Sequence, residues 1–194
     1  KKIINNNNNK IITDLDIFYS RNINNIKTTI TGTNGKSTTA KLLYEVLHRH
    51  KRDVRLIGNI GKPVLSEKKI SKRTEFVIEA SSYQIAYSKF FKSTHSMILN
   101  ISPDHLERHG TIKNYINAKF KLIKKQKYGA FAFIQKNNKY LNKLAKNSKI
   151  NSKIIKVSNR ISKKVKKLIS NQYFHNTNNL NNLAFVLAIA KIIK

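Results

Sequence analysis

The sequence has 194 residues, with 39 Lys and Arg, 9 Asp and Glu, and no Cys. This length fits one large domain, and the lack of Cys excludes disulfides and thiolate metal sites. No apolar run approaches the roughly 20 residues that a membrane span requires, so we expect a cytoplasmic protein. The net charge of +30 would suit a nucleic-acid partner, but the Lys residues are spread along the whole chain. We therefore interpret most of the charge as solvated surface and do not expect nucleic acid to be the partner.

The first 26 residues are polar and rich in Asn, with one short apolar patch at residues 16–19. We interpret residues 1–26 as the remnant of a preceding domain with its linker, and residues 27–194 as the next domain. The chain does not begin with Met and ends within an apolar periodic stretch. We therefore expect it to be a piece of a longer protein.

Short apolar runs alternate with helical patterns from Lys27 onward. Runs rich in β-branched and aromatic residues predict strands at residues 28–31, 54–57, 76–79, 97–100, 130–134 and 154–157. Apolar residues at helical spacing predict helices at residues 37–49, 82–88, 112–125, 138–145 and 180–193. Strands that alternate with helices are typical of a doubly wound, mostly parallel sheet with flanking helices. The sequence therefore predicts an α/β fold.

The strongest local signal is Thr-Gly-Thr-Asn-Gly-Lys-Ser-Thr at residues 31–38, between a predicted strand and a predicted helix. Glycines let backbone N–H groups approach phosphate oxygens, and the helix N-terminus adds its positive dipole end. The Lys would neutralise the outer phosphates, and the next hydroxyl would coordinate Mg²⁺. The general phosphate-loop pattern has a further Gly where this sequence has Ile30, so a Gly-rich turn with an incidental Lys is the alternative. The predicted nucleotide-binding residues of this segment are Gly32, Thr33, Asn34, Gly35, Lys36, Ser37 and Thr38.

An acidic residue, Glu79, ends the predicted strand at residues 76–79. Ligands of parallel α/β sheets collect beyond the carboxyl ends of the strands, where a carboxylate is well placed to hold Mg²⁺. The alternative is an acid at the start of a helix that Ser81 or Ser82 caps.

The loop after the next predicted strand is crowded with charged residues and His. A metal ligand there would be His105, with its other ring nitrogen oriented by a carboxylate. A surface loop rich in His is the alternative. The crowded residues are Asp104, His105, Glu107, Arg108 and His109.

Three further segments are ambiguous when taken alone. The glycines of Gly-Asn-Ile-Gly at residues 58–61 permit a close ligand approach or a simple tight turn. In the predicted helix at residues 112–125, Lys119 is one more Lys among many. The segment at residues 175–179, which contains Asn176 and Asn179, could simply cap the last helix.

Taken in order, these motifs resemble the Mur ligase family, the ATP-dependent ligases that build the peptide of bacterial cell walls. The resemblance runs from about Thr28 to the C-terminus, and the family uses the same shortened phosphate loop. The loop and the Asp-His-Leu segment at residues 104–106 are shared with the wider superfamily, which includes folylpolyglutamate synthase. The segments at residues 58–61 and 79–84 favour the D-glutamate-adding type.

The resemblance also implies cofactors and residue roles. ATP and two Mg²⁺ ions would bind, with Lys36 and its loop on the phosphates and with Ser37 and Glu79 serving the first ion. The second ion would be held by His105 and by Lys119, which matches the carbamylated lysine of the family. Catalytic roles would fall to Lys36, His105 and Lys119. Asn59 and Ser81 would contact the UDP-sugar substrate, and Asn176 and Asn179 the adenine side, although the repeated Asn181-Asn182 leaves that register open.

The activity implied is the addition of D-glutamate to UDP-N-acetylmuramoyl-L-alanine through an acyl phosphate, by a monomer. The family has three domains, so the chain would be the central ATP-binding domain and inactive alone. The alternatives are another Mur or folylpolyglutamate-type ligase, a non-catalytic remnant, and a basic nucleic-acid-binding ATPase. Against the last, the Tyr and Phe residues mostly lie within apolar runs and not among the basic residues.

Overall fold

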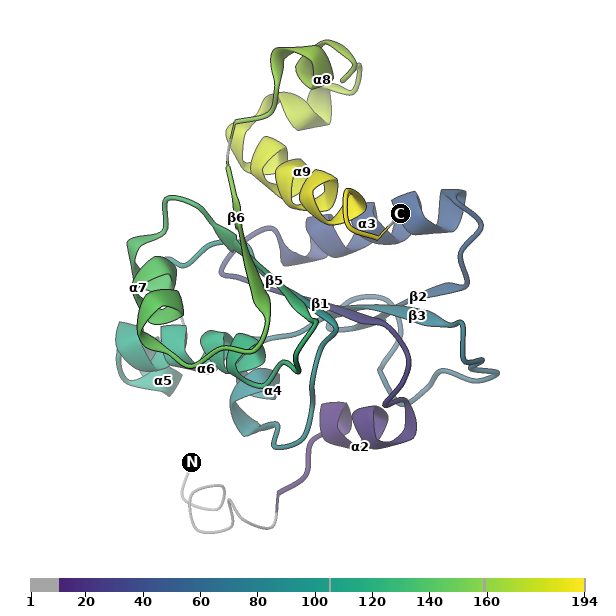
Figure 1. Cartoon of the computed structure of the whole chain (residues 1–194), viewed down its shortest axis with the longest axis vertical. Coiled ribbons are helices and arrows are strands. Elements are labelled where there is room, and N and C mark those ends of the chain that lie inside the picture. The colour runs from purple at the N-terminus through teal and green to yellow at the C-terminus, as the bar shows by residue number, and fades with distance from the viewer. Residues whose placement is uncertain (1–10, 105, 159, 194) are drawn as a thin grey trace.

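The computed structural model describes residues 11–104, 106–158 and 160–193, and these form a layered α/β fold (Figure 1). A six-stranded sheet has the order β2-β3-β1-β4-β5-β6, and every pair of neighbouring strands is parallel. This confirms the predicted fold class. The strands are β1 (Lys27–Thr31), β2 (Val54–Gly58), β3 (Glu75–Glu79), β4 (His95–Ile98), β5 (Phe131–Gln135) and β6 (Lys153–Val157).

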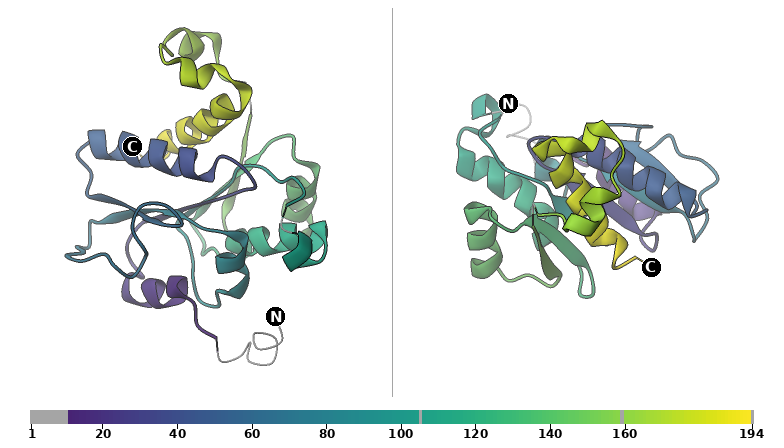
Figure 2. Two further views of the ribbon diagram at one scale, coloured as in Figure 1. Left: turned by 180° about the vertical axis from the view of Figure 1, so that it is seen from behind. Right: turned by 90° about the horizontal axis from the view of Figure 1, so that it is seen from above.

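Helices cover both faces of the sheet. Figures 1 and 2 show α3 and α9 on one face and α2, α4, α6 and α7 on the other. The helices are α2 (Asp14–Arg21), α3 (Lys36–Arg49), α4 (Ser82–Tyr87), α5 (Leu106–His109), α6 (Ile112–Lys124), α7 (Lys139–Asn147), α8 (Lys163–Lys167), the 3-10 helix η2 (Gln172–His175) and α9 (Thr177–Ala190). No helix in the described part of the chain is long and apolar enough to cross a membrane.

The predicted elements lie close to the observed ones, with two informative shifts. The strand predicted at residues 97–100 is β4, which begins two residues earlier, because His95 and Ser96 are buried in register with Thr28 and Thr29 of β1. Polar side chains at these positions hid the start of the strand. The last helix begins at Thr177, three residues before the prediction, because the Asn176 side chain caps it.

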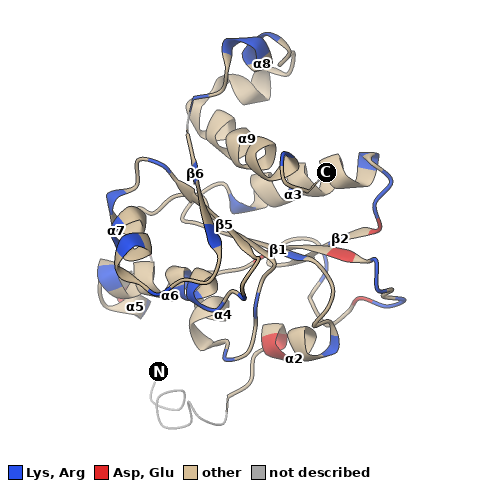
Figure 3. Ribbon diagram, in the orientation of Figure 1, with Lys and Arg blue, Asp and Glu red and all other residues tan. Residues whose placement is uncertain are grey.

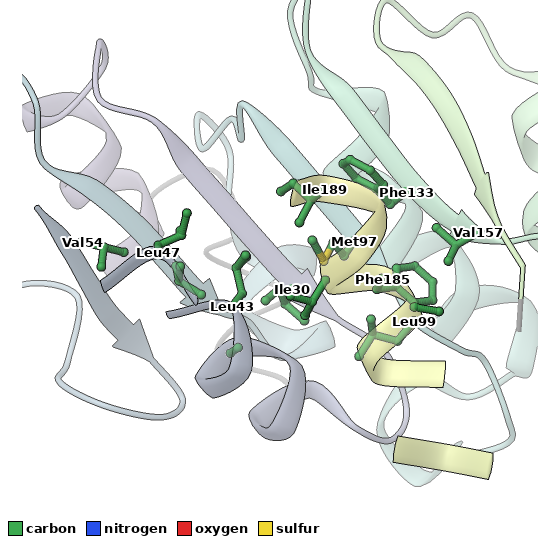
Figure 4. Close-up of a cluster of buried hydrophobic side chains, with 14 of the residues drawn as sticks. Ile30, Leu43, Leu47, Val54, Met97, Leu99, Phe133, Val157, Phe185 and Ile189 are labelled. Atoms are coloured by element: carbon green, nitrogen blue, oxygen red, sulfur yellow. The ribbon is translucent and has the colours of Figure 1, made fainter. Parts of the chain in front are cut away.

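The apolar core is divided by the sheet. On one side, side chains of α3 and α9 pack against β1, β4 and β5, with Ile30, Leu43, Met97, Phe133 and Phe185 at the centre (Figure 4). Two smaller clusters fill the opposite side, one beneath α2 and one beneath α6 and α7. Burial on both faces is typical of a parallel sheet and explains the continuous apolar run of β3.

The helix α2, which the sequence analysis did not predict, packs onto the same body. Thr13 and Asp16 form a capping box at its start, and the Phe18 ring meets the Phe76 ring edge to face at 4.8 Å. The Asp16 carboxylate also accepts the backbone N–H groups of residues 89–91. These bonds outweigh burial and lower its pKa to about 2. Residues 13–26 therefore fold against this domain, and the division at residue 26 stays a prediction.

Candidate functional site

The carboxyl edge of the sheet has one reversal of strand order. β1 lies between β3 and β4, although β3 and β4 follow each other in the chain. Connections that leave such a point in opposite directions open a crevice in which α/β proteins bind ligands. The loops after β1, β3 and β4 all begin at this place, and they carry most of the residues singled out in the sequence.

The loop after β1 joins the sheet to the 14-residue helix α3. Gly35 precedes the helix with φ of 81°, in the left-handed region that favours glycine. A Cβ atom at this position would also collide with the Asn182 side chain of α9. Only a glycine therefore fits between the start of α3 and α9, and the first N–H groups of α3 face the crevice with the positive end of the helix dipole.

An amide side chain from the neighbouring strand fixes the shape of this loop. Oδ1 of Asn100, which follows β4, accepts the N–H groups of Thr33 at 3.1 Å and of Asn34 at 2.8 Å. The Asn100 amide nitrogen donates to the Asn34 carbonyl at 3.0 Å. Sequence reasoning missed this role, because an Asn in an Asn-rich chain carries no distinguishing signal.

The predicted phosphate and Mg²⁺ ligands lie together at the start of α3. The Lys36 ammonium donates to the Thr33 carbonyl at 2.8 Å, so its side chain folds over the loop. The Ser37 hydroxyl donates to Oε2 of Glu79 at 2.8 Å, across the gap between the ends of β1 and β3. Glu79 is buried, whereas Ser37 is exposed toward the crevice. The structure thus brings together a hydroxyl and a carboxylate from two separate motifs.

The Gly-Asn-Ile-Gly segment turns directly beside Glu79. Gly58 has φ of 107°, and a Cβ there would collide with the Glu79 carbonyl oxygen. The backbone N–H of Asn59 donates to that same carbonyl at 3.0 Å, which leaves the Asn59 side chain exposed. The Ser81 hydroxyl accepts the N–H of Gln84 at 3.2 Å in the capping box of α4. Asn59 and Ser81 therefore both lie close to the Glu79 backbone.

A buried lysine lies beneath the phosphate loop. Lys119 of α6 is 2% exposed, and its ammonium donates to the Gly32 carbonyl at 2.9 Å. Its nitrogen also lies 4.5 Å from the centre of the Tyr115 ring. Burial, with a further contribution from the nearby Lys36 charge, lowers the pKa of Lys119 to about 7. A large fraction of this amine is therefore neutral at physiological pH, unlike an exposed lysine.

Aromatic rings connect the loop after β4 to the same lysine. The His109 ring stacks on Tyr83 at 5.0 Å and meets Tyr115 edge to face at 5.3 Å. His109 also makes a 3.0 Å hydrogen bond with the Ser82 hydroxyl. The Tyr115 hydroxyl lies 3.2 Å from the hydroxyl of Thr33. His109, at the end of α5, is therefore held at the crevice.

The predicted metal ligand His105 lies outside the described residues. Within the described ranges, no group of three or more His, Cys, Asp or Glu residues is placed to hold a metal ion. The oxygen donors that the structure does bring together are those of Ser37 and Glu79.

The last Asn-rich motif is distributed differently from the sequence assignment. Asn176 is exposed and accepts the N–H of Asn179 as the cap of α9. The Asn179 amide is buried and donates to the Tyr173 carbonyl at 2.8 Å. Asn182, one turn further along α9, is the amide packed against Gly35.

A cavity of about 240 Å³ lies between the phosphate loop and α9. Amide side chains form much of its wall, and Phe185 and Leu99 supply apolar surface. Asn182 belongs to this wall, whereas Asn176 does not. The amides in the wall belong to Asn34, Asn100, Gln135, Asn178, Asn181 and Asn182.

Comparison with known families gives one match that spans most of the chain. The sequence profile of the Mur ligase middle domain matches residues 30–190. The chain belongs to the Mur ligase family. The matched range contains the phosphate loop, Glu79, the loop after β4, Lys119 and α9, which together make up the crevice described above.

Curated relatives of this Mur ligase domain include two D-glutamate ligases. The UDP-N-acetylmuramoylalanine–D-glutamate ligase of Rickettsia bellii is 34% identical, over 99% of this chain and 47% of the relative. The enzyme of the same name from Rickettsia prowazekii is 35% identical, over 94% of this chain and 44% of the relative. The chain thus spans less than half the length of these relatives.

Solved structures show the same fold at lower identity. MurF ligase from Thermotoga maritima, in complex with ADP, superposes with a TM-score of 0.72 and 18% identity, over 94% of this chain and 50% of that protein. E. coli FolC, in complex with DHPP and ADP, has a TM-score of 0.55 and 10% identity, over 78% of this chain and 49% of that protein. These similarities establish the fold of the Mur ligase domain.

Proposed function

We propose that this chain is the ATP-binding part of a ligase that adds D-glutamate to UDP-N-acetylmuramoyl-L-alanine. The choice within the family is supported by the relatives of that name, at 34% and 35% identity over almost the whole chain. One structural observation carries the chemistry. The phosphate loop, the Ser37–Glu79 pair and the buried Lys119 meet at one point of the carboxyl edge.

The loop residues would hold the phosphates of ATP. Backbone N–H groups at the start of α3 point into the crevice, and the helix dipole favours negative charge there. Lys36 would leave the Thr33 carbonyl and turn to the outer phosphates, so that one contact within the protein is exchanged for a charge pair. Asn100 would keep the loop in one shape while this exchange takes place.

The residues present fit one Mg²⁺ ion. Mg²⁺ prefers hard oxygen ligands, and a hydroxyl and a carboxylate lie 2.8 Å apart where the phosphates would end. Ser37 and Glu79 would hold this ion, directly or through water. Bound there, Mg²⁺ would neutralise charge on the phosphate oxygens during transfer.

A second ion would require a change at Lys119, because an amine is not a ligand of Mg²⁺. The neutral amine can attack CO₂ to form a carbamate, with the release of one proton and a change of charge from neutral to negative. The lowered pKa of Lys119 provides the neutral amine. The carbamate oxygens and His105 would then bind the second ion, as the resemblance to the family implies.

The reaction that this arrangement supports has two steps. A substrate carboxylate attacks the γ-phosphorus of ATP, which forms an acyl phosphate and releases ADP. The amine of D-glutamate then attacks the acyl carbon, which forms the amide and releases phosphate and a proton. The contribution of the protein is charge neutralisation and alignment, from Lys36, the loop N–H groups and the metal-binding side chains. Asn59 and Ser81, beside Glu79, would position the carboxylate end of the UDP-sugar substrate.

The base of the nucleotide would lie in the cavity next to α9. Its wall of amides can donate to and accept from an adenine edge, while Phe185 and Leu99 offer apolar contact. We propose Asn182 as a nucleotide contact, since it lines this cavity, whereas Asn176 caps the helix outside it. Asn182→Ala should raise the dissociation constant for Mg-ATP about tenfold, and Asn176→Ala should change it less than about threefold. The reverse order in a calorimetric titration would restore the assignment to Asn176.

The function is tested on the whole ligase that would contain this chain, by phosphate release from Mg-ATP with UDP-N-acetylmuramoyl-L-alanine as acceptor. We expect release that depends on D-glutamate and is not supported by L-glutamate, L-lysine or L-alanine. Lys36→Ala should abolish it, whereas Lys41→Ala, an exposed lysine on the same helix, should leave it unchanged. Turnover that requires another amino acid would assign a different ligase, and near-normal turnover of Lys36→Ala would remove the phosphate loop from the mechanism.

A further inference from the structure

The two kinds of charge are distributed unequally along the chain. All nine acidic residues occur at or before Glu107, and the charged residues that follow are all basic. A composition that simply favours Lys would raise the number of bases everywhere without confining the acids to one part. Figure 3 shows the result in space, with blue segments at α5, α6, α7, β6 and α8 and no red beyond α5.

The helix α8, in which four of the five residues are Lys, projects from the body of the protein. Figures 1 and 2 show α8 beyond the end of α9, away from the sheet. We call residues 160–168 the basic knuckle. Leu168 at its end is 77% exposed, and the half-buried Val165 is the residue of α8 that packs against the core. The exposed basic residues of the knuckle are Arg160, Lys163, Lys164, Lys166 and Lys167.

The sequence of α8 disfavours the helical conformation. Lys163 and Lys166 are three residues apart and Lys163 and Lys167 four, so like charges face each other along the helix. No acid lies in its first turn to match the helix dipole. Within the described ranges, none of these side chains forms an ion pair. Such a conflict with local helix stability is expected at functional or strained segments.

We infer that the basic knuckle docks on an anionic lipid bilayer surface. Clustered lysines are attracted to acidic headgroups, and each contributes about fivefold to the affinity for such a surface. Leu168 adds an apolar side chain that gains free energy when it enters the boundary between headgroups and acyl chains. The chain would lie on the membrane without spanning it.

Nucleic acid offers the same phosphate charge but fits the knuckle less well. Single-stranded nucleic acid is held by aromatic rings on which bases stack, and the knuckle has no aromatic residue. The nearest aromatic residues are already engaged. The Tyr173 hydroxyl lies 3.3 Å from that of Thr38, and its ring meets Phe174 edge to face at 5.4 Å. An exposed leucine also gains nothing against a phosphate backbone.

The test compares two variants of the chain that lose equal charge. In the first, Lys163, Lys164, Lys166 and Lys167 are changed to Gln. In the matched control, Lys139, Lys143, Lys146 and Lys149 on and after α7 are changed to Gln, and all eight side chains are exposed. Binding is measured by sedimentation with vesicles of phosphatidylcholine containing about one-third phosphatidylserine, and with vesicles of phosphatidylcholine alone.

We expect the unaltered chain to bind the anionic vesicles and not the neutral ones. The knuckle variant should bind at least about tenfold more weakly, and the α7 control less than about threefold more weakly. Leu168→Ser should weaken binding about threefold with all charges retained. Equal losses in the two charge variants would reduce the effect to net charge and overturn the proposal.

A parallel titration with single-stranded RNA and duplex DNA tests whether the knuckle prefers nucleic acid to the anionic lipid surface. Tighter binding to either than to the vesicles, lost in the knuckle variant and unaffected by Leu168→Ser, would assign the knuckle to nucleic acid and overturn the lipid assignment. The measurements need no catalytic activity, so failure of the ligase proposal leaves their outcome readable.

Discussion

Two buried lysines lie at the two ends of β1, and they differ in what surrounds the amine. Lys27 begins the strand, is 1% exposed, and donates to the carbonyl oxygens of Asn22, Ile23 and Asn25. Lys119 lies beyond the other end, is 2% exposed, and donates to the Gly32 carbonyl, with the Thr31 hydroxyl more distant at 3.4 Å. Burial lowers both pKa values, to about 8 for Lys27 and about 7 for Lys119.

The comparison shows that burial alone does not mark a reactive lysine. All three protons of the Lys27 ammonium have an acceptor, so this group holds the turn from α2 into β1 together. The Lys119 amine has fewer acceptors among the described residues. A neighbouring lysine lowers the pKa of both groups, Lys127 for Lys27 and Lys36 for Lys119, so the acceptors make the difference. We interpret the first lysine as structural and the second as chemical.

The largest effect is expected at Lys119. Lys119→Ala should lower ligation at least about 100-fold, because a metal-binding oxygen pair would be lost, and short carboxylates should restore part of it. The carbamate itself should give a carbonyl signal in a carbon-13 NMR spectrum under labelled CO₂. That signal should disappear in Lys119→Ala and persist in Lys27→Met. Full activity of Lys119→Ala would make the two lysines equivalent in function.

The next effect concerns stability and falls on Lys27. Lys27→Met keeps the length of the side chain but leaves three carbonyl groups without their donor, so the free energy of unfolding should fall by about 2 kcal/mol. Activity per folded molecule should stay within about twofold of the unaltered protein. Urea titration with a parallel activity assay measures both quantities. Unchanged stability would show that the carbonyl groups form hydrogen bonds with water instead.

A pH titration should separate the lysines further. Both have folded-state pKa values below the ordinary value of 10.5, so the unfolded chain binds more protons between about pH 7 and 10.5. Stability should therefore rise with pH across this window, by up to about 1.4 kcal/mol per pH unit for each proton released. The contribution of Lys27 begins near pH 8, and the rise above pH 8 should be smaller in Lys27→Met. A fall in stability across this window would contradict the assigned pKa directions.

The smallest effect is expected at the ring beside Lys119. Tyr115→Phe keeps the aromatic face 4.5 Å from the ammonium and removes only the hydroxyl that meets Thr33. Stability should fall by about 1 kcal/mol, with no change in the carbamate signal. Loss of that signal would show that the hydroxyl, and not the burial, controls the state of Lys119.

Much of the fold was predictable from periodicity, since all six strands and five of the helices are close to their predicted positions. The helices α2, α5 and α8 and the start of β4 were not predicted. α2 has a Thr-x-x-Asp capping signal at residues 13–16, but it lies in an Asn-rich stretch that resembles a linker. The start of β4 was lost because its buried residues are polar, and their burial depends on β1, far away in sequence.

Residues of the candidate site were predictable where they belong to a distinctive sequence motif. The phosphate loop and Glu79 are legible in the sequence, and the structure brings Ser37 and Glu79 into contact. Taken without the family resemblance, Lys119 was as indistinguishable from the other basic residues as Lys27, because burial is a property of the assembled fold. The repeated Asn residues of α9 left the register of the last motif open in the sequence, and the packing of Asn182 against Gly35 is what separates it from its neighbours.

The hydrogen bonds by which Asn100 holds the phosphate loop affect how the loop folds. This residue lies 66 positions after the loop residue that it holds, just beyond the end of β4, a strand that pairs directly with β1. We therefore expect the loop to take its final shape only once β4 has joined the sheet, because the hydrogen bonds that hold it come from a residue beyond that strand. The ability to bind a nucleotide should then appear in one step with the closed sheet during refolding, so nucleotide fluorescence would report the completion of the central strands.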